Sequence, residues 1–183
     1  MEVLRVGAAF PDPPFNGMAD NTGLDIDLMT EIGKALGATV EFVPYAGADF
    51  DGIFDALDAG AYDCVAAGIT VTPERERKAM FLPPYLISGQ ALAVDTTRLP
   101  HVKSIDDLDG LTIGVQQGNT SRPIAGRLVA EGKAAAVRVY DHGTIRDALT
   151  DLTTGACDAC MTLAPVLTEL VKPIPGVEVV QRG

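Results

Sequence analysis

The order of the predicted secondary-structure segments restricts the fold more than any other feature of this sequence. In the first half of the 183-residue chain, strand-like and helix-like runs alternate, and they cover residues 4–9, 24–37, 39–45, 50–59 and 62–67. A strand followed by a helix and another strand usually belongs to a parallel sheet with helices on its faces. This half therefore predicts an α/β unit built on a parallel sheet.

The apolar spacing of the two helical runs predicts which sides face the core. The first run carries an apolar residue at every fourth position, at Leu24, Leu28, Ile32 and Leu36. We expect this row to form the apolar face of the helix and Gly37 to end it. The shorter run is expected to turn a second apolar group inward, formed by Ile53, Phe54 and Leu57.

A second series of alternating strands and helices follows. Its predicted segments are residues 111–115, 120–131, 135–140, 144–154, 157–161 and 164–171, and an extended run closes the series at 177–180. The stretch between the two series has a different character. It contains a proline-stiffened loop at 81–85, an extended run at 87–94 and a polar, turn-rich stretch at 95–108 that includes a one-turn helix at 104–108.

The two series predict two α/β lobes. Lobe 1 is expected at residues 1–88 and lobe 2 at 89–180, and residues 181–183 are expected to start a return to lobe 1. The extended runs near 87–94 and 177–182 are then the hinge strands that join the lobes.

Charge and hydrophobicity exclude some classes of partner. The net charge of −11 argues against nucleic-acid binding, which requires clustered lysine and arginine. No run approaches the roughly 18 apolar residues of a membrane-spanning helix. The N-terminus does not resemble a signal peptide, so we expect an exported natural protein to have lost its leader and Met1 to be an added start.

The three cysteines give only a weak redox signal. Cys157 and Cys160 have the CxxC spacing of some metal and redox sites, but they fall in a strand-like run. Residues three apart on a strand point to opposite faces and lie about 10 Å apart, which is too far for a disulfide. We expect these two residues, and Cys64 in another apolar strand, to be structural thiols. Neither a metal nor a cofactor is expected.

Residues 68–75, GITVTPER, combine groups that suit a small carboxylate. Gly68 allows a ligand to approach the backbone. Thr70 and Thr72 offer hydroxyl donors, and Thr72 also suits the N-cap of a short helix. Arg75, on the first turn of that helix, presents a planar fork that can grip a carboxylate through two hydrogen bonds. The alternative is an ordinary strand–loop–helix connection with a capping threonine and a surface arginine.

Residues 116–121, QQGNTS, give a second anion signal. They join a predicted strand to the start of a helix, where unpaired N–H groups carry the positive end of the helix dipole. Gly118 permits a tight turn, and Asn119, Thr120 or Ser121 can cap the helix. The alternative is a capped helix that binds nothing. Both signals follow the carboxyl ends of strands, where open α/β sheets bind ligands, so together they favour a shared cleft.

Five segments of the chain match, in order, the motifs of one protein family. They are GLDIDL at 23–28, AGITVTPER at 67–75, PYLISG at 84–89, LDGLTIGVQQGNT at 108–120 and GACDA at 155–159. The chain thereby resembles the family 3 solute-binding proteins, which are periplasmic or lipid-anchored amino-acid receptors of ABC importers. The resemblance implies the type II periplasmic binding protein fold, in which two Rossmann-like lobes close on a ligand about a hinge.

The resemblance also implies roles for single residues of lobe 1. Arg75 matches the arginine that clamps the ligand carboxylate, while Gly68 and Thr70 match positions that meet its α-amino and carboxylate groups. Phe50 matches an aromatic residue that packs on the ligand side chain.

The matching positions in lobe 2 complete this implied site. Thr120, which follows Gly118, matches the residue that finishes the carboxylate site, and Gln116 matches a position that often contacts the ligand side chain.

The sequence departs from the family at the positions that pair with a ligand ammonium. Leu163 stands where the family usually has an aspartate, and Thr162, which precedes it, is a candidate ligand contact. Ala9 stands where some members carry an acid. An unpaired buried ammonium is costly. Asp12, expected to enter the cleft from lobe 1, is one substitute, although a plain turn aspartate between prolines explains it equally. An α-amino acid is the expected ligand, with keto acids, hydroxy acids and other small carboxylates left open.

Length is a further departure, because family members continue beyond the position of Gly183 and return to lobe 1. A lobe 1 without this segment is expected to expose apolar surface. We expect a monomer, with a domain swap or dimer as the alternative.

Three functions remain open on the sequence. The favoured one is a periplasmic or extracellular receptor that delivers its ligand to an ABC permease. The others are the ligand-sensing domain of a signalling receptor and a dehydratase acting on a cyclic carboxylate. We expect no enzyme, because the sequence has no Ser–His–Asp set, metal cluster or paired acids that can be placed in the cleft.

Overall fold

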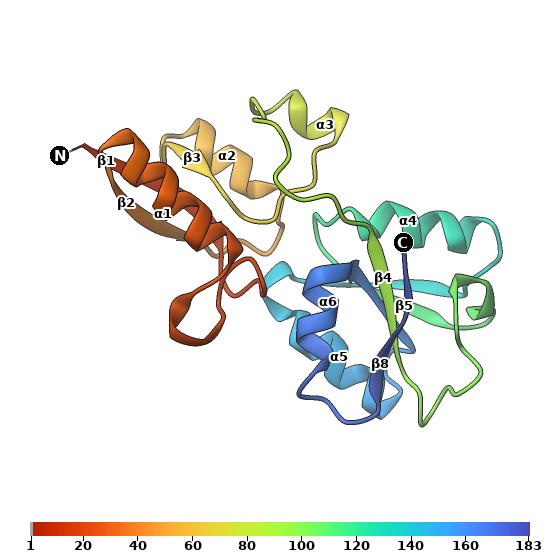
Figure 1. Ribbon diagram of the computed structural model, residues 1–183. Coiled ribbons are helices and arrows are strands. Elements are labelled where there is room, and N and C mark those ends of the chain that lie inside the picture. The colour runs from red at the N-terminus through yellow and green to blue at the C-terminus, as the bar shows by residue number, and fades with distance from the viewer. Residues whose placement is uncertain (1) are drawn as a thin grey trace. The chain divides into compact units, whose positions relative to one another are not determined.

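The computed structural model describes residues 2–183 and shows two compact α/β units, one ending at Ile87 and the other running from Ser88 to Gly183 (Figure 1). We call them unit 1 and unit 2 and describe each by itself. No helix in the described part of the chain is long and apolar enough to cross a membrane.

Unit 1 is built on a three-stranded parallel sheet with the strand order β2-β1-β3. Its elements are β1 (Val3–Ala9), η1 (Ala19–Asn21), α1 (Leu24–Leu36), β2 (Thr39–Tyr45), α2 (Gly52–Asp58), β3 (Cys64–Val65) and α3 (Pro73–Glu76). β1 and β2 pair along their whole lengths, from Val3 opposite Thr39 to Ala9 opposite Tyr45. The predicted parallel α/β arrangement of the first half is confirmed.

The predicted apolar face of α1 is correct only in part, because Ile32 packs against the core of unit 1 whereas both ends of the predicted row are exposed. Leu24 and Leu36 are 41% and 68% exposed, and the row that faces the sheet consists of Asp25, Met29 and Gly33. A Cβ atom at Gly33 would overlap the Val40 side chain, so this glycine allows the helix to lie close against β2. This close approach buries the row of Asp25, Met29 and Gly33 more deeply than the predicted row, of which Ile32 still packs against the core. Gly37 ends the helix in the left-handed conformation, as predicted.

β3 is shorter than predicted, because only Cys64 and Val65 pair with β1. The predicted strand at 62–67 still contributes to the core on both sides of these two residues. Tyr62 is buried and donates a 2.8 Å hydrogen bond to the carbonyl of Ile53, while Ala67 packs in the same apolar cluster as Phe54. The strand pairing therefore ends at Val65, and the next two residues, Ala66 and Ala67, are buried before the loop begins at Gly68.

Unit 2 contains a five-stranded mixed sheet with the order β6-β5-β7-β4-β8. Its elements are β4 (Gln90–Asp95), η2 (Ile105–Asp107), β5 (Thr112–Gln116), α4 (Ser121–Ala130), β6 (Ala136–Tyr140), η3 (His142–Thr144), α5 (Ile145–Thr154), β7 (Ala159–Leu163), α6 (Ala164–Val171) and β8 (Val177–Arg182). β6, β5 and β7 are parallel, whereas β4 runs antiparallel to both β7 and β8.

Helices cover both faces of this sheet, with α4 on one face and α5 and α6 on the other (Figure 1). The core under α4 includes Leu92, Ile113, Val115 and Leu128, which are all at least 95% buried. The segments expected as hinge strands form β4 and β8 within this sheet. The helices and strands of the second half are thus present, with β7 displaced two residues towards the C-terminus of its predicted position.

The displacement of β7 places Cys157 just before the strand and Cys160 inside it, both buried as free thiols. Cys64 is also a free thiol and is partly buried. Burial raises the pKa of Cys160 to about 12, so this thiol stays protonated at neutral pH. The expectation of a structural role is confirmed for Cys157 and Cys160, which pack in the interior of unit 2.

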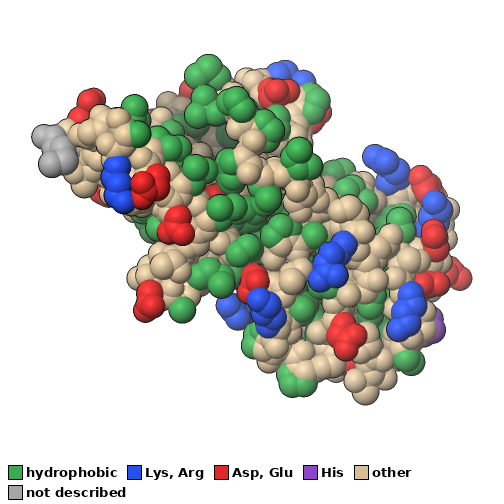
Figure 2. Space-filling model, in the orientation of Figure 1, with side chains coloured by type: hydrophobic (Ala, Val, Ile, Leu, Met, Phe, Trp, Pro, Cys, Tyr) green, Lys and Arg blue, Asp and Glu red, His purple; other side chains and the backbone are tan. Residues whose placement is uncertain are grey.

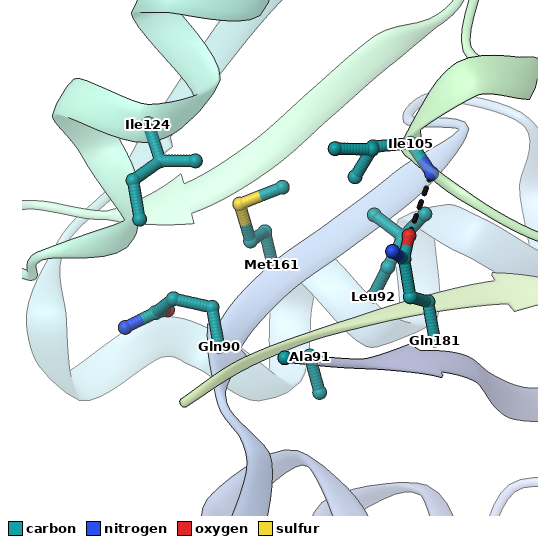
Figure 3. A pocket seen from close by; sticks show the side chains of 8 residues that line it. Gln90, Ala91, Leu92, Ile105, Ile124, Met161 and Gln181 are labelled. Atoms are coloured by element: carbon teal, nitrogen blue, oxygen red, sulfur yellow. Dashed lines mark hydrogen bonds between the residues drawn. The ribbon is translucent and has the colours of Figure 1, made fainter. Parts of the chain in front are cut away.

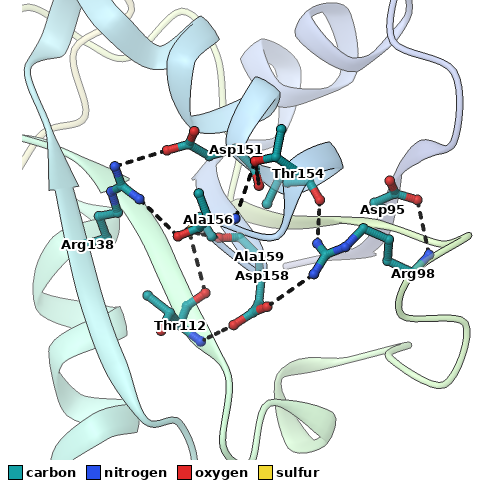
Figure 4. Close-up of polar contacts among 11 residues, drawn as sticks. Asp95, Arg98, Thr112, Arg138, Asp151, Thr154, Ala156, Asp158 and Ala159 are labelled. Carbon is teal, nitrogen blue, oxygen red and sulfur yellow. Dashed lines mark hydrogen bonds and ion pairs between the residues drawn. The ribbon is translucent and has the colours of Figure 1, made fainter.

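A polar cluster fixes the amino end of β5 (Figure 4). The Asp158 carboxylate accepts a 2.9 Å hydrogen bond from the N–H of Thr112 and lies 3.9 Å from the guanidinium of Arg98. Arg138 forms a 3.2 Å ion pair with Asp151 nearby. Because Thr112 begins β5, this cluster lies at the opposite end of the strand from Gln116. The GACDA segment, which contains Asp158, therefore has a structural role here.

Candidate functional site

The loop between β3 and α3 depends on a glycine at its start. Gly68 has a φ of +57°, which is a left-handed conformation that residues with side chains avoid. A Cβ atom at this position would lie 2.6 Å from the Phe15 ring. The loop can therefore pass close to Phe15 and turn only with glycine at position 68.

The short helix that follows is capped as predicted. The Thr72 hydroxyl accepts a 3.2 Å hydrogen bond from the N–H of Arg75, and Pro73 occupies the first helical position. α3 has only four residues, and the N–H of Glu76 also donates a 2.9 Å hydrogen bond to the carbonyl of Thr72. It places Arg75 one turn beyond the ligand-binding loop predicted at Gly68 and Thr70.

The Arg75 side chain points into unit 1 and is only 5% exposed as a residue. Its Nε donates a 3.0 Å hydrogen bond to the Asp51 carboxylate, and its Nη1 donates one of 3.0 Å to the carbonyl of Thr70. The centre of the guanidinium lies 5.2 Å from the Phe50 ring centroid and 5.9 Å from that of Phe54, at cation–π distance. Arg75 is therefore a buried, oriented cation rather than a mobile surface arginine.

These contacts bring together three of the predicted site residues and add one that the sequence did not indicate. Arg75, Thr70 and Phe50 meet, and Phe50, predicted to pack on a ligand, lies against the guanidinium. Asp51 was missed because it precedes α2, 24 positions before its partner. The sequence signal that could have indicated Asp51 is its position directly after Phe50, a predicted site residue.

The loop that follows β1 contains the predicted Asp12 and is fixed by a buried amide. Asn16 is fully buried, donates a 2.8 Å hydrogen bond to the carbonyl of Ala9 and accepts one of 2.8 Å from the N–H of Asp12. Burial, together with the nearby Asp25 carboxylate, raises the pKa of Asp12 to about 8. The protonated form of the Asp12 carboxyl is therefore favoured at neutral pH far more than in an exposed aspartate.

Asp25 joins this loop to the Gly68 turn. Its carboxylate is fully buried and accepts hydrogen bonds from the N–H of Gly68 at 2.8 Å and from the hydroxyl of Tyr85 at 2.6 Å. Burial raises the pKa of Asp25, and these two hydrogen bonds act in the opposite direction. The sequence reasoning missed Asp25 because it assigned the inward face of α1 to the leucine row.

In unit 2, the predicted anion-binding turn leads from β5 to α4. Gly118 has a φ of +78°, which confirms the predicted tight turn, and α4 begins at Ser121 with Thr120 at the N-cap position. The Thr120 side chain does not cap the helix, because its hydroxyl accepts a 2.9 Å hydrogen bond from Nε2 of Gln90. The predicted side-chain cap is also not supplied by Ser121, whose buried Oγ has no hydrogen-bond partner among residues 2–183.

Gln116 and Thr162 lie inside unit 2 in one hydrogen-bond network. They are 3% and 1% exposed, and the Thr162 hydroxyl lies 3.3 Å from Oε1 of Gln116. Nε2 of Gln116 donates a 2.7 Å hydrogen bond to the carbonyl of His142, and Asn119 donates one of 2.8 Å to Oε1 of Gln116. The network ties together the carboxyl ends of β5 and β7 and the start of η3. The structure thus uses both ends of the Gln116 amide within the protein.

A small hollow lies beside Gln90 in unit 2 (Figure 3). It has a volume of about 130 Å³, and its apolar side includes Leu92, Ile105 and Met161. Oε1 of Gln90 is buried without a hydrogen-bond partner within residues 2–183, while the other glutamine of the hollow, Gln181, accepts a 2.7 Å hydrogen bond from the N–H of Ile105. Gln90 therefore links this apolar hollow to the Thr120 hydroxyl.

Apolar side chains are also exposed on unit 1, where Figure 2 shows them gathered around α3 and the segment that follows it. Met80, Leu82 and Ile87 are 90%, 73% and 92% exposed. Among the residues that the structure describes, no group of three His, Cys, Asp or Glu side chains could hold a metal ion. Within unit 1 the candidate polar groups are Arg75 and Asp12, and within unit 2 they are Thr120 and Gln116.

Comparison with known sequences identifies relatives that cover nearly the whole chain. The sequence pattern of the bacterial extracellular solute-binding proteins, family 3, matches residues 4–150. The chain is 28% identical over 177 residues to the ABC transporter arginine-binding protein 1 of Escherichia coli K12, covering 95% of this chain and 68% of that protein. It is 30% identical over 172 residues to the L-cystine-binding protein TcyJ of the same organism, covering 92% and 62%.

Solved structures show the same relationship. An ancestral arginine-binding protein bound to arginine is 37% identical with a TM-score of 0.87, and the match covers all of this chain and 80% of that one. The ancestral amino-acid-binding protein AncCDT-1, described as a precursor of cyclohexadienyl dehydratase, is 35% identical with a TM-score of 0.84, and the match covers 99% and 78%. The chain spans about two thirds of the length of the two curated relatives and about four fifths of these two structures.

Proposed function

Since the chain belongs to the bacterial extracellular solute-binding proteins of family 3, we propose that it binds a small carboxylate, with an α-amino acid as the first candidate, and delivers it to an ABC permease. The observation that carries the proposal is the buried Arg75 guanidinium, oriented by Asp51 and the Thr70 carbonyl. Relatives named for binding arginine and cystine support an amino-acid ligand. The proposed location, as for the family, is outside the cytoplasmic membrane.

The orientation of Arg75 explains why it suits a carboxylate. An arginine whose Nε and Nη1 already make fixed hydrogen bonds has lost most of its side-chain entropy before any ligand arrives. The low exposure of the guanidinium also strengthens its attraction for an anion, because less water screens the charge. We propose that the Gly68–Thr70 loop adds backbone and hydroxyl contacts to the same ligand.

Unit 2 is proposed to supply a second set of contacts to the carboxylate. The N-terminus of the ten-residue helix α4 carries N–H groups that have no partner within the helix and the positive end of the helix dipole. The Thr120 hydroxyl accepts a hydrogen bond from Gln90, which leaves its proton for donation to an anion. Contacts from both units would allow the ligand to favour a closed arrangement, since a ligand shifts a conformational equilibrium only by its differential affinity.

Asp12 is the acid that we propose for a ligand ammonium. Burial and the nearby Asp25 carboxylate raise the pKa of its carboxyl to about 8, which favours the protonated form. An ammonium placed beside it would favour ionisation and release a proton. A ligand without an ammonium leaves Asp12 neutral, so keto and hydroxy acids are the alternative ligand class.

A thermal-shift panel tests the proposed ligand class. The panel contains L-arginine, L-glutamine, L-histidine, L-cystine and the corresponding keto and hydroxy acids, because a bound ligand raises the melting temperature by mass action. Binders are then titrated calorimetrically against the Arg75→Ala variant. Loss of a charge-assisted hydrogen bond of about 1.5–3 kcal/mol predicts an affinity at least about tenfold weaker.

Arg77→Ala is the matched control for this titration. Arg77 is the next arginine on the chain, but its side chain is 70% exposed and pairs only loosely with Glu74 at 3.7 Å. We expect this variant to bind like the unmodified protein. Equal affinities for the Arg75→Ala variant and the unmodified protein would contradict the assignment of Arg75.

A second candidate function is dehydration of a cyclic carboxylate. The feature that suits it is the carboxyl of Asp12, whose pKa is raised to about 8 by burial and by the Asp25 carboxylate, because a general acid must carry its proton at the working pH. The structural similarity to AncCDT-1 is in keeping with this candidate. Incubation with prephenate decides it: turnover that disappears in the Asp12→Asn variant supports an enzyme, and intact prephenate excludes this reaction.

A further inference from the structure

We propose that Asp25 is a positioning residue whose single carboxylate binds both the Gly68 turn and the segment around Tyr85 near the end of unit 1. The assignment rests on the proposed function, because the Gly68 turn matters only as part of a carboxylate site. Asp25 itself is fully buried, so its role is to place other groups rather than to contact the ligand.

The burial of this carboxylate needs an explanation. A buried, ionised carboxylate is costly unless hydrogen bonds satisfy it. Asp25 has two such bonds from distant parts of unit 1, from the Gly68 N–H at 2.8 Å and from the Tyr85 hydroxyl at 2.6 Å. It also lies in the first turn of the 13-residue helix α1, where the helix dipole favours negative charge. Each oxygen therefore has its own donor, and the helix contributes further stabilisation.

The Gly68 bond determines the course of the ligand-binding loop. The sheet ends at Val65, so the N–H of Gly68 has no strand partner, and Asp25 takes that place. Two residues later the carbonyl of Thr70 accepts the hydrogen bond from Arg75. The position of the guanidinium thus depends on a backbone turn that Asp25 anchors.

The Tyr85 bond fixes a second segment that has little structure of its own. No helix or strand lies between α3 and β4, and Tyr85 is 47% exposed as a residue. Its hydroxyl nevertheless reaches the buried Asp25 carboxylate, and burial beside Asp25 raises the pKa of this phenol. Tyr85 lies two residues before the end of unit 1 at Ile87. Movement of the segment is therefore opposed by the same group that holds the ligand-binding loop.

Backbone hydrogen bonds add a third segment to the same helix turn. The N–H of Asp25 donates to the carbonyl of Phe15 at 2.9 Å, and the N–H of Leu24 donates to the carbonyl of Pro14 at 2.9 Å. The loop that carries Asp12 is therefore fixed by the backbone of this turn, independently of the Asp25 side chain. Substitution of Asp25 is expected to release the Gly68 turn and Tyr85 but to leave the Asp12 loop in place.

NMR of the full chain tests this assignment without a ligand. In the Asp25→Ala variant we expect exchange of the Gly68 amide proton to be at least tenfold faster and the Tyr85 Cζ signal, assigned with Tyr85→Phe, to shift. The Asp25→Asn variant should restore protection of Gly68, because its carboxamide oxygen can accept from the amide while its NH₂ group faces the phenol oxygen.

Met29→Ala is the matched control, because Met29 lies one turn further along the same buried row of α1. It should lower stability without selective exchange at Gly68. A protected Gly68 amide in the Asp25→Ala variant, or equal acceleration throughout unit 1, would overturn the proposal. If the Asp25→Ala variant does not fold, the Tyr85→Phe variant tests the assignment instead. It should shift the NMR signals of the residues around Tyr85 while the Gly68 amide stays protected from exchange. Unaltered signals around Tyr85 would count against the assignment.

Binding of L-arginine to the same variants separates this proposal from the proposed function. We expect the Asp25→Ala variant to bind L-arginine at least tenfold more weakly than the Met29→Ala variant at a temperature where both are folded. Equal affinities of these two variants would count against Asp25 as a positioning residue. Absence of binding to the unmodified protein would count against arginine as the ligand, while the exchange data still decide the role of Asp25.

Discussion

Raising the pH from 5 to 7 is expected to weaken unit 1 through the buried carboxyl of Asp12. The pKa of Asp12 is raised from 3.8 to about 8 in the folded protein by burial and by the nearby Asp25 carboxylate. Between these two values the folded state keeps the proton and the unfolded state releases it. The free energy of unfolding therefore falls as the pH rises through this interval, by at most about 1.4 kcal/mol per pH unit, and levels off above the folded-state pKa.

Urea unfolding at pH 5, 6 and 7 measures this slope. Three of the four tyrosines, Tyr45, Tyr62 and Tyr85, lie in unit 1, and the chain has no tryptophan, so tyrosine fluorescence reports mainly on this unit. Asp12→Asn removes one of the two carboxyls of unit 1 whose pKa burial raises, the other being Asp25, and should reduce the fall in the free energy of unfolding by about 1–3 kcal/mol over the two pH units.

The control for this experiment removes a charge that is exposed. Asp58 ends α2 on the surface of unit 1, so Asp58→Asn changes the net charge equally without altering the buried carboxyl. This variant should retain the slope of the unmodified protein. If Asp12→Asn keeps the original slope as well, the carboxyl of Asp12 is ionised in the folded protein and the reasoning from its burial is refuted.

Two further substitutions test the turns of the site. Gly68→Ala should lower the free energy of unfolding by more than about 1 kcal/mol in urea, because its φ of +57° and the nearby Phe15 ring oppose a side chain. Gly60→Ala, at a φ of +77° but in open space, should cost less, and equal losses would argue against the ring contact. Gln90→Ala should weaken ligand binding about two- to tenfold by calorimetry through the loss of its bond to Thr120. Gln181→Ala, which changes the other glutamine of the hollow, should leave ligand affinity unchanged. Equal losses of affinity in the two variants would exclude the contact with Thr120 as the cause.

The sequence pattern predicted the elements of the fold well because alternating strands and helices leave few arrangements. Gly37 as the end of α1 and Thr72 as the cap of α3 were also predictable, since both depend only on neighbouring residues. The inward face of α1 was not, because two adjacent rows on the helix are both partly apolar. The choice between them depends on the close approach of Gly33 to Val40.

The site residues that the sequence did not indicate make contacts over long separations. Asp25 meets Gly68 across 43 positions and Tyr85 across 60, and Asp51 meets Arg75 across 24. No local spacing rule connects such pairs, since folding alone brings them together. Gln116 illustrates the same limit, because its position at a strand end was predictable but the network that occupies its amide was not.

The contacts of Arg75 have a consequence for transplanting this recognition element into another protein. α3 is only one turn long, and its arginine is oriented by Asp51 and Phe50, which precede α2 in a separate part of the chain. A graft of residues 70–76 alone would transfer Arg75 without Asp51 and Phe50, which orient its guanidinium. A chimaera must therefore also include Phe50 and Asp51 before α2. In related sequences, substitutions at these two positions are expected to accompany substitutions at Arg75.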